Sequence, residues 1–372
     1  MRAGLVHHSL NSRGGGERVA VNVIELLNEM GFEVELITSQ PPDFKQLNSA
    51  YNRDVRVNKV RSLLPIKISV FGIYQRLFTS IPAASSKVDI LVNTHGDVLP
   101  HISSNNIPTI TYCHFPSVAL LLKDYPSKYQ NSLFWRIYFE PYRRIMQGRM
   151  SKSICTGVVL TNSEFSKKAI IDLYPKANPV IISPPVDTKS FRQILNSSRR
   201  ENQVLVVSRF TSEKRLELAL EVAKKLKVKV VIICSLIPAN KLYFEMLEDK
   251  IQKESLQNQV TLLPNASFST LLDTMSKSKV YLHTMRGEHF GISIVEAMSA
   301  GLIPVVPDYG GFTEFVPRQY HYNDIYKMID NIQYAFDLAY SERDKISNIA
   351  DQFSEQNFKS KMKKLIEDAC TA

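Results

Sequence analysis

The sequence predicts an α/β protein with two domains, each built on a parallel β-sheet. A strand–helix–strand pattern occupies residues 2–38, and a second such pattern occupies residues 203–234. Strand, helix and strand in succession form the βαβ unit of a parallel sheet, so the second pattern indicates a new sheet rather than an extension of the first. Pro184 and Pro185 stand between the two patterns and mark a boundary.

Size and composition agree with this division. A chain of 372 residues is long for a single core, and its 44% apolar and 22% charged content is that of an ordinary globular protein. A polar tract at 193–203 follows the two prolines. We therefore assign residues 1–186 to an N-terminal domain and residues 187–350 to a C-terminal domain.

The sequence contains no apolar run of membrane-spanning length, and its first residues lack the apolar core of a signal peptide. The four cysteines are widely scattered, without a Cys-x-x-Cys pair. Such spacing is typical of reduced thiols. We expect a cytoplasmic protein.

The first predicted strand, at 2–8, leads into a glycine run, Gly14-Gly15-Gly16, that opens a helix ending near Gly31. Glycines at this position let backbone N–H groups approach a phosphate or a sugar closely. The run lacks the third glycine of Gly-x-Gly-x-x-Gly and the lysine of a P-loop, which disfavours nicotinamide and ATP motifs. A flexible surface turn is the alternative interpretation.

Further short strands of the N-terminal domain are predicted at 88–93, 109–113, 158–160 and 180–183. His114 follows the second of these strands. The carboxyl end of a parallel strand is where open α/β sheets bind ligands, so His114 is a candidate functional residue. A structural role is the alternative, because a lone histidine is usually structural.

Two stretches of the N-terminal domain combine apolar and basic residues. The stretch at 62–84 predicts a core helix, with a lipid-facing surface as the alternative. The stretch at 123–152 mixes tyrosines, phenylalanines and Trp135 with lysines and arginines, which suits an anionic membrane surface or a helix pair with a solvated basic face. Residues 101–200 carry fourteen Lys and Arg against five Asp and Glu, most of the formal net charge of +10. Single-stranded nucleic acid is a third option, but no nucleic-acid-binding module accompanies the stretch, so we expect no nucleic-acid partner.

The most informative stretch of the C-terminal domain runs from Glu288 to Glu296. Strand-like runs at 280–283 and 303–306 flank it, and Gly291 stands at the start of a short helix. A strand, a glycine turn and a helix aim free backbone N–H groups at an anion. Two acids that frame an anion site indicate recognition of hydroxyl groups on a phosphate-bearing ligand such as a sugar nucleotide.

Arg209 and Lys214 lie after the first strand of the C-terminal domain, in the turn that connects this strand to the next helix. Arginine suits bidentate contact with phosphate, and lysine supplies a compact charge, so both could reach one diphosphate. A solvated basic loop is the alternative. The sequence contains no Asp-x-Asp triplet, and we expect no metal cofactor.

Several motifs occur together in one order along the chain. They are Pro185-Val186-Asp187 ahead of Phe191, Ser208-Arg209 with Glu213-Lys214, Glu288 and Glu296 in a Glu-x7-Glu pattern, and Gly310-Gly311 with Glu314. This combination resembles glycosyltransferase family 4 (GT4), retaining enzymes of the GT-B fold. Within that family, Gly14 to Arg18 and Tyr112 to Pro116 are similar to Alg11-type GDP-mannose α-1,2-mannosyltransferases of lipid-linked oligosaccharide assembly.

The resemblance implies two Rossmann-like domains that face each other across a cleft, with part of 351–372 packing back on the N-terminal domain. It also implies roles for individual residues. Arg209 and Lys214 would bind the donor diphosphate, Glu296 the ribose hydroxyls and Glu288 the donor sugar. Backbone N–H groups of Phe290, Gly291 and Ile292 would meet sugar and phosphate, Gly15 and Gly16 would lie against the donor, and His114 would face the transferred sugar.

Family members retain anomeric configuration, and the usual proposal is front-face attack in which the leaving phosphate accepts the acceptor proton. The similarity to Alg11-type enzymes implies GDP-mannose as the donor and a lipid-linked or other membrane glycan as the acceptor. Eukaryotic Alg11-type proteins carry an N-terminal membrane anchor that this sequence lacks, so we expect peripheral attachment to the cytoplasmic face of a membrane. The alternatives are a GT4 transferase that uses UDP-glucose or UDP-N-acetylglucosamine, and a sugar-nucleotide-binding subunit without turnover.

Overall fold

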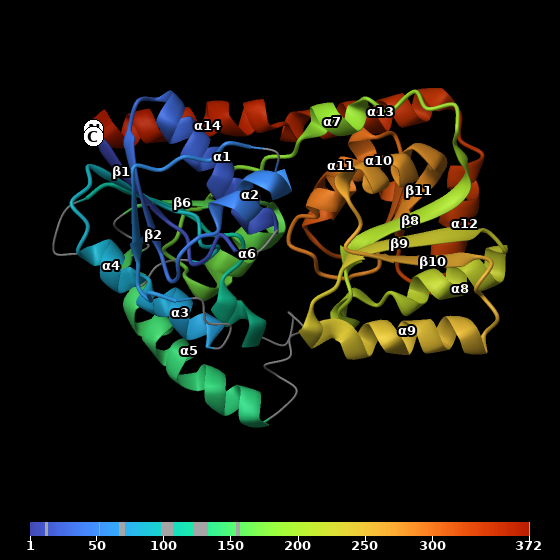
Figure 1. Ribbon diagram of the computed structural model, residues 1–372, viewed down its shortest axis with the longest axis horizontal. Coiled ribbons are helices and arrows are strands. Elements are labelled where there is room, and N and C mark those ends of the chain that lie inside the picture. Colours follow the sequence, from blue (N-terminus) through green and yellow to red (C-terminus); the bar gives the residue numbers. More distant parts are fainter. Residues whose placement is uncertain are drawn as a thin grey trace. The chain divides into compact units, whose positions relative to one another are not determined.

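The computed structural model describes residues 1–11, 14–51, 53–66, 71–97, 107–121, 133–153 and 157–371. The chain forms two compact units, each with one parallel sheet and its own core (Figure 1). The first unit comprises Met1–Pro185 together with Glu355–Ala372, and the second comprises Val186–Ser354. The division between the units thus falls directly after Pro185. The predicted α/β class with two Rossmann-like domains is confirmed.

The sheet of the first unit has seven parallel strands in the order β3-β2-β1-β4-β5-β6-β7. The strands are β1 (Arg2–Val6), β2 (Glu33–Thr38), β3 (Lys59–Ser62), β4 (Ile90–Asn93), β5 (Thr109–Tyr112), β6 (Val158–Thr161) and β7 (Val180–Ile181). The strand order reverses between β1 and β4, so the carboxyl ends of these strands border a switch point where open α/β sheets bind ligands.

The helices of the first unit cover this sheet. They are α1 (Gly15–Glu29), α2 (Phe44–Tyr51), α3 (Gly72–Phe78), α4 (Ser80–Ala84), α5 (Leu133–Ser153), α6 (Glu164–Leu173) and α14 (Glu355–Thr371), with a 3-10 turn at Ser117–Leu121. Ser163 caps α6 as its position predicts, because its hydroxyl accepts a hydrogen bond from the Ser166 N–H at 3.1 Å.

The last helix, α14, belongs to the first unit although it ends the chain, as the family resemblance implied. Its buried face, Phe358, Met362 and Ile366, joins the core formed by β1, β2 and α1. Lys359 reaches Glu25 on α1 at 3.0 Å. The helix is therefore an integral part of the first unit's core and not an appendage.

The prediction of one helix over 62–84 is wrong. The described part of this stretch ends β3 at Ser62 and then forms the short helices α3 and α4. Residues 67–70 lie outside the described residues, as do 123–132 of the basic aromatic stretch, whose remainder forms α5. Within the described residues, no helix is both long enough and apolar enough to cross a membrane.

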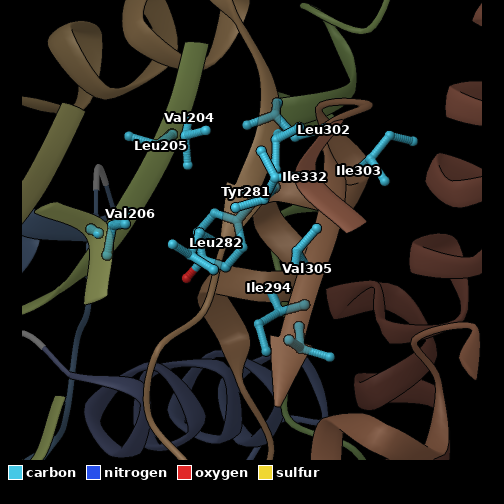
Figure 2. Close-up of a cluster of buried hydrophobic side chains, with 14 of the residues drawn as sticks. Val204, Leu205, Val206, Tyr281, Leu282, Ile294, Leu302, Ile303, Val305 and Ile332 are labelled. Carbon is cyan, nitrogen blue, oxygen red and sulfur yellow. The ribbon is translucent and has the colours of Figure 1, made fainter. Parts of the chain in front are cut away.

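The sheet of the second unit has six parallel strands in the order β10-β9-β8-β11-β12-β13. They are β8 (Glu201–Arg209), β9 (Lys229–Ser235), β10 (Val260–Pro264), β11 (Ser278–Leu282), β12 (Ile303–Pro307) and β13 (His321–Tyr322). Figure 2 shows side chains of the strands β8, β11 and β12, among them Val206, Leu282 and Val305, beside Ile294 of a neighbouring helix. All four are 2% exposed or less, so the strands that carry the candidate site residues are anchored in the core.

The helices of the second unit are α7 (Thr188–Arg192), α8 (Glu217–Leu226), α9 (Lys241–Lys253), α10 (Phe268–Lys277), α11 (Ile292–Ser299), α12 (Ile325–Phe336) and α13 (Tyr340–Ala350). The switch point of this sheet lies between β8 and β11, which pair in parallel although β9 and β10 intervene in sequence. The loops that follow β8 and β11 therefore leave the sheet side by side at its carboxyl edge.

Candidate functional site

An ion pair between Lys214 and Glu288 joins the two loops at the carboxyl edge of the second sheet. The Lys214 ammonium donates to Oε2 of Glu288 at 2.5 Å, and the two side chains are 8% and 25% exposed. Lys214 ends a 3-10 turn after β8, and its carbonyl accepts a hydrogen bond from the Thr284 hydroxyl of the loop after β11. The loops after β8 and β11 are thus held together by a side-chain contact to Glu288 and by a backbone contact to Thr284.

Charge around Glu288 keeps it ionised. Burial alone would raise the pKa of Glu288, but the Lys214 ammonium and the nearby His283 and His289 outweigh burial and hold that pKa well below its usual range. Burial also lowers the pKa of His283 and of His289 to about 4. At neutral pH His283 and His289 are therefore uncharged, and the Lys214 ammonium is the charge that acts on the Glu288 carboxylate; the histidines add to it only at acid pH.

Tyr281, on β11, links the strand to helix α11. Its hydroxyl pairs with the Ser293 hydroxyl at 2.8 Å and donates to the carbonyl of Val207 on β8 at 3.2 Å. Burial raises the pKa of Tyr281, and the charges of Glu296 and Glu288 raise it further. Both acids of the Glu-x7-Glu pattern therefore lie close enough to one phenol to interact with it electrostatically.

Helix α11 begins where the sequence predicts, directly after Gly291. This residue has φ 99°, a left-handed conformation that favours glycine, and a Cβ there would lie 2.6 Å from Cδ1 of Ile294. The first backbone N–H groups of a helix have no partner within it, which leaves those near Ile292 available to an anion. Glu296 is the fifth residue of the helix and 7% exposed, one turn beyond a capping position.

The backbone of Glu288 is fixed by the glycine pair Gly310-Gly311. The Gly311 N–H donates to the Glu288 carbonyl at 2.8 Å, and a Cβ on Gly310 would stand 2.9 Å from the same carbonyl oxygen. Gly310 has φ 146°. The two glycines named in the sequence motif thus allow the loop after β12 to pack directly on the acid.

Arg209 is the last residue of β8, whereas the sequence predicts that it follows this strand. Its side chain is exposed, and it makes no hydrogen bond or ion pair within the part of the chain that the structure describes. Lys214 is already paired with Glu288, whereas Arg209 leaves an uncommitted guanidinium on the strand that carries the site. The structure therefore places the two predicted phosphate ligands in different environments.

The remaining predicted residues lie in the first unit. Gly15 and Gly16 open α1, and a Cβ on Gly16 would lie 3.5 Å from Nε2 of His114. The N–H of His114 donates to the carbonyl of Gly96 at 3.0 Å, after β5. Gly16 and His114 are 98 positions apart in the sequence, yet they are neighbours at one edge of the first sheet.

Three further histidines lie at the same edge of the first sheet as His114. His7 and His8 follow β1, and His95 follows β4, so all of them lie at carboxyl ends of strands next to the switch point. Burial lowers the pKa of His8 and of His95 well below the ordinary value, and the charge of Arg76 lowers both further. Nδ1 of His7 contacts the carbonyl of Thr94 at 2.9 Å.

The sequence analysis missed His283 and the histidines beside His114. His283 is 4% exposed, packs its ring 5.2 Å from that of Phe312, and has a buried Nε2 without a hydrogen-bond partner among the described residues. The positional argument that selected His114 applies equally to His283, because both directly follow an apolar strand. Groups of three or more His, Cys, Asp or Glu side chains that could hold a metal ion are absent from the described residues.

Two parallel-sheet units and a last helix that returns to the first unit form the architecture of the GT-B glycosyltransferases. The family model Glycosyltransferase Family 4 matches residues 13–190, and the model Glycosyl transferases group 1 matches residues 187–336. Together these models span most of the chain. The protein belongs to the GT4-type glycosyltransferases.

Curated relatives are similar at lower identity. The GDP-Man:Man(3)GlcNAc(2)-PP-Dol alpha-1,2-mannosyltransferase of Dictyostelium discoideum is 28% identical over 258 residues, which are 62% of this chain and 50% of that protein. The protein of the same name from Kluyveromyces lactis is 26% identical over 352 residues, 81% of this chain and 60% of that protein. The chain spans about half the length of the first of these relatives.

Solved structures share the fold. Sucrose-phosphate synthase from Thermosynechococcus elongatus superposes with a TM-score of 0.75 at 16% identity, covering 99% of each chain. A glycosyltransferase from Rickettsia africae gives a TM-score of 0.71 at 16% identity, covering 99% of this chain and 98% of the other. Such identities show the fold alone.

Proposed function

We propose that this protein is a hexosyltransferase that moves mannose from GDP-mannose, with retention of anomeric configuration, onto a lipid-linked oligosaccharide or a related membrane glycan. The observation that carries the proposal is the buried Lys214–Glu288 pair beside the start of α11. An ionised carboxylate can accept hydrogen bonds from sugar hydroxyls, while the backbone N–H groups at the start of the neighbouring helix bind a phosphate of the same ligand.

The diphosphate would be bound by cations and backbone N–H groups without a divalent metal. Arg209 offers a guanidinium that is not engaged elsewhere in the described structure, and Lys214 would exchange part of its contact with Glu288 for a phosphate oxygen. Negative charge grows on the leaving diphosphate as the sugar bond breaks. Hydrogen-bond donors that already point at the position of that charge stabilise the transition state more than the ground state, and they therefore lower the barrier.

The two acids would divide recognition of the donor. Glu296, inside α11, would accept hydrogen bonds from the ribose hydroxyls, while Glu288 would contact the mannose. Backbone N–H groups of Phe290, Gly291 and Ile292 would complete the contacts, since the Phe290 side chain itself packs away among Phe315 and Phe353. Neither acid is thereby the proton acceptor of the reaction, and that role would fall to the leaving phosphate.

On the acceptor side, Gly15 and Gly16 would allow the donor to approach α1, and His114 would face the transferred sugar. The support is the packing of Gly16 against the His114 ring, because a Cβ at Gly16 would already be in van der Waals contact with Nε2 of His114. The curated relatives, GDP-Man:Man(3)GlcNAc(2)-PP-Dol alpha-1,2-mannosyltransferases, support a dolichol-linked oligosaccharide as the acceptor class and GDP-mannose as the donor.

Two other functions compete with this proposal. A GT4 enzyme that uses UDP-glucose or UDP-N-acetylglucosamine would share every site residue named above, because those residues contact diphosphate, ribose and sugar but not the base. A binding subunit without turnover is disfavoured, because the Lys214–Glu288 ion pair is intact and the N-cap of α11 carries no side-chain cap hydrogen bond.

The experiment is a donor panel. Purified protein is incubated with GDP-mannose, UDP-glucose and UDP-N-acetylglucosamine, with and without a dolichol-linked oligosaccharide, and both nucleotide release and sugar transfer are measured. We expect release and transfer with GDP-mannose, and an α linkage in the product by NMR. Preferred use of a UDP-sugar would contradict the donor assignment, and a β linkage would contradict retention.

A further inference from the structure

Two partly or fully buried arginines lie at the amino edge of the second sheet, opposite to the edge that carries Lys214 and Glu288. Arg200 directly precedes β8, and Arg343 lies on α13. Helix α13 packs against α11 (Figure 1). A Cβ built on Gly301, which precedes β12, would stand 3.4 Å from Nη2 of Arg200 and 3.7 Å from Cβ of Arg343. Both arginines therefore border one point at the end of α11.

Arg200 donates its hydrogen bonds to backbone carbonyls and not to an acid. Nη1 donates to the carbonyl of Ser278 at 2.6 Å, and Nη2 donates to that of Ala300, the C-cap residue of α11. Nε is buried and has no partner among the described residues. Burial and, after it, the charge of Arg343 lower the pKa of Arg200 to about 10. Arg200 is thus still a cation at neutral pH, and no described carboxylate pairs with it.

Arg343 is 5% exposed, yet it makes no hydrogen bond or ion pair with another described residue. The Ser347 hydroxyl, on the next turn of α13, donates to the Ser299 carbonyl at 2.9 Å. Because Arg200 binds the Ala300 carbonyl, the last carbonyls of α11 have other donors than Arg343. The described residues therefore surround this guanidinium without supplying a partner for it.

The guanidinium of Arg343 is costly to the protein in this environment. Burial lowers its pKa, because removal from water disfavours the charged form. A buried charge without a partner destabilises the folded state, and the charge of Arg200 nearby is of the same sign. Nε of Arg200 is enclosed by protein, whereas no nitrogen of Arg343 is, so a small anion can reach the Arg343 guanidinium.

We propose that Arg343 binds a small oxyanion of the phosphate type at this amino edge, in a site separate from the donor site. A guanidinium matches such an ion because its N–H groups donate two parallel hydrogen bonds to two oxygens. Arg200 stays on its carbonyls and adds the attraction of a second positive charge. Free phosphate and the phosphate group of a larger metabolite both present this chemistry. The inference is independent of the proposed reaction, because the two sites lie at opposite edges of the sheet.

The experiment follows thermal unfolding of the full chain in buffers of matched ionic strength that contain chloride, inorganic phosphate or glucose 6-phosphate. Arg343→Met keeps a long apolar side chain and removes the charge. In chloride, this variant should unfold at the temperature of the parent protein or above it, because an uncompensated charge is removed. In phosphate, the parent protein should gain stability by mass action, and the variant should gain less. In calorimetric titration, the substitution should weaken phosphate affinity at least about tenfold.

Arg199→Met is the matched control for the loss of a positive charge. Arg199 is the neighbour of Arg200 in the sequence, but it pairs with Asp273 at 2.8 Å and its side chain is 55% exposed. This variant should respond to phosphate as the parent protein does, which also accounts for the general stabilising effect of phosphate on proteins. Arg209→Gln, at the carboxyl edge of the sheet, should keep the part of the response that depends on Arg343.

An equal phosphate response of the parent protein and Arg343→Met would overturn the proposal, as would the absence of a response in the parent protein. A lower unfolding temperature of Arg343→Met in chloride would also overturn it, because the guanidinium would then have a partner within the protein. Loss of the response in Arg209→Gln alone would assign the phosphate to the donor site and contradict a second site. With the site confirmed, a stronger response to glucose 6-phosphate identifies a phosphorylated metabolite as the occupant, and a weaker one identifies the free ion.

Discussion

Replacing Lys214 by methionine leaves the Glu288 carboxylate without its ammonium partner, and replacing Glu288 by glutamine leaves the ammonium without its carboxylate. Removing one partner of a buried ion pair costs about 3–5 kcal/mol of unfolding free energy. The Glu288 side chain is 25% exposed, so water offsets part of that cost, and we expect about 2–3 kcal/mol for each single variant.

The double variant Lys214→Met/Glu288→Gln removes both charges and leaves neither uncompensated. Its loss should be smaller than the sum of the two single losses, with a coupling energy of about 2 kcal/mol. Urea denaturation of the four proteins measures the cycle. Sugar transfer should fall at least about 100-fold in all three variants, because the donor contacts are lost whether or not stability is recovered.

A second cycle on Lys229 and Glu201 provides the control. Their ion pair has the same chemistry at 3.2 Å, in the same unit, but the side chains are 62% and 45% exposed. An exposed pair contributes less than about 1 kcal/mol, so we expect little coupling and unchanged transfer. Additive losses at Lys214 and Glu288, or coupling equal to that of the exposed pair, would refute the view that the buried pair organises the site.

Three further predictions concern the loops around the site. Gly310→Ala should lower the unfolding temperature and donor affinity, because φ 146° and the approach to the Glu288 carbonyl exclude a Cβ, and calorimetry measures both. Between pH 6.5 and about 4 the unfolded chain protonates His283 while the folded chain does not, because burial lowers the pKa of His283 to about 4. His283 by itself should therefore lower the unfolding free energy by about 1.4 kcal/mol for each unit by which the pH falls. His283→Asn should remove this share of the slope in urea titrations, and an unchanged slope would contradict the burial argument. Gly16→Val should lower sugar transfer about tenfold by displacing the His114 ring, whereas Gly16→Ala, at an ordinary contact distance of 3.5 Å, should retain activity.

The sequence predicted those parts of the fold that depend on local pattern. Alternating strands and helices gave both sheets, and Gly291 marked the start of α11 because its left-handed conformation leaves a sequence signature. The prediction of one core helix over 62–84 failed because the stretch begins with the end of β3 and its later part is divided into the short helices α3 and α4. Leu77 and Ala83 of these helices are buried while Phe78 and Ile81 are exposed, so hydrophobicity alone did not show where the helices begin and end.

The candidate site was predictable in its members but not in their pairing. Lys214 and Glu288 were named for separate roles, one on phosphate and one on sugar, and their ion pair depends on the β8–β11 crossover that sequence spacing does not encode. The sequence predicts His283 only as the last residue of the strand-like run at 280–283, although the carboxyl end of a strand at a switch point is a ligand-binding position.

The most direct test of the donor site is calorimetric titration of GDP-mannose into the parent protein and into Lys214→Met. The proposal predicts that the parent protein binds GDP-mannose more tightly than UDP-glucose, and that the substitution weakens GDP-mannose binding at least about tenfold while the protein stays folded at the titration temperature. Equal affinity of the parent and variant proteins for GDP-mannose would contradict the assignment of the donor site to the loops after β8 and β11.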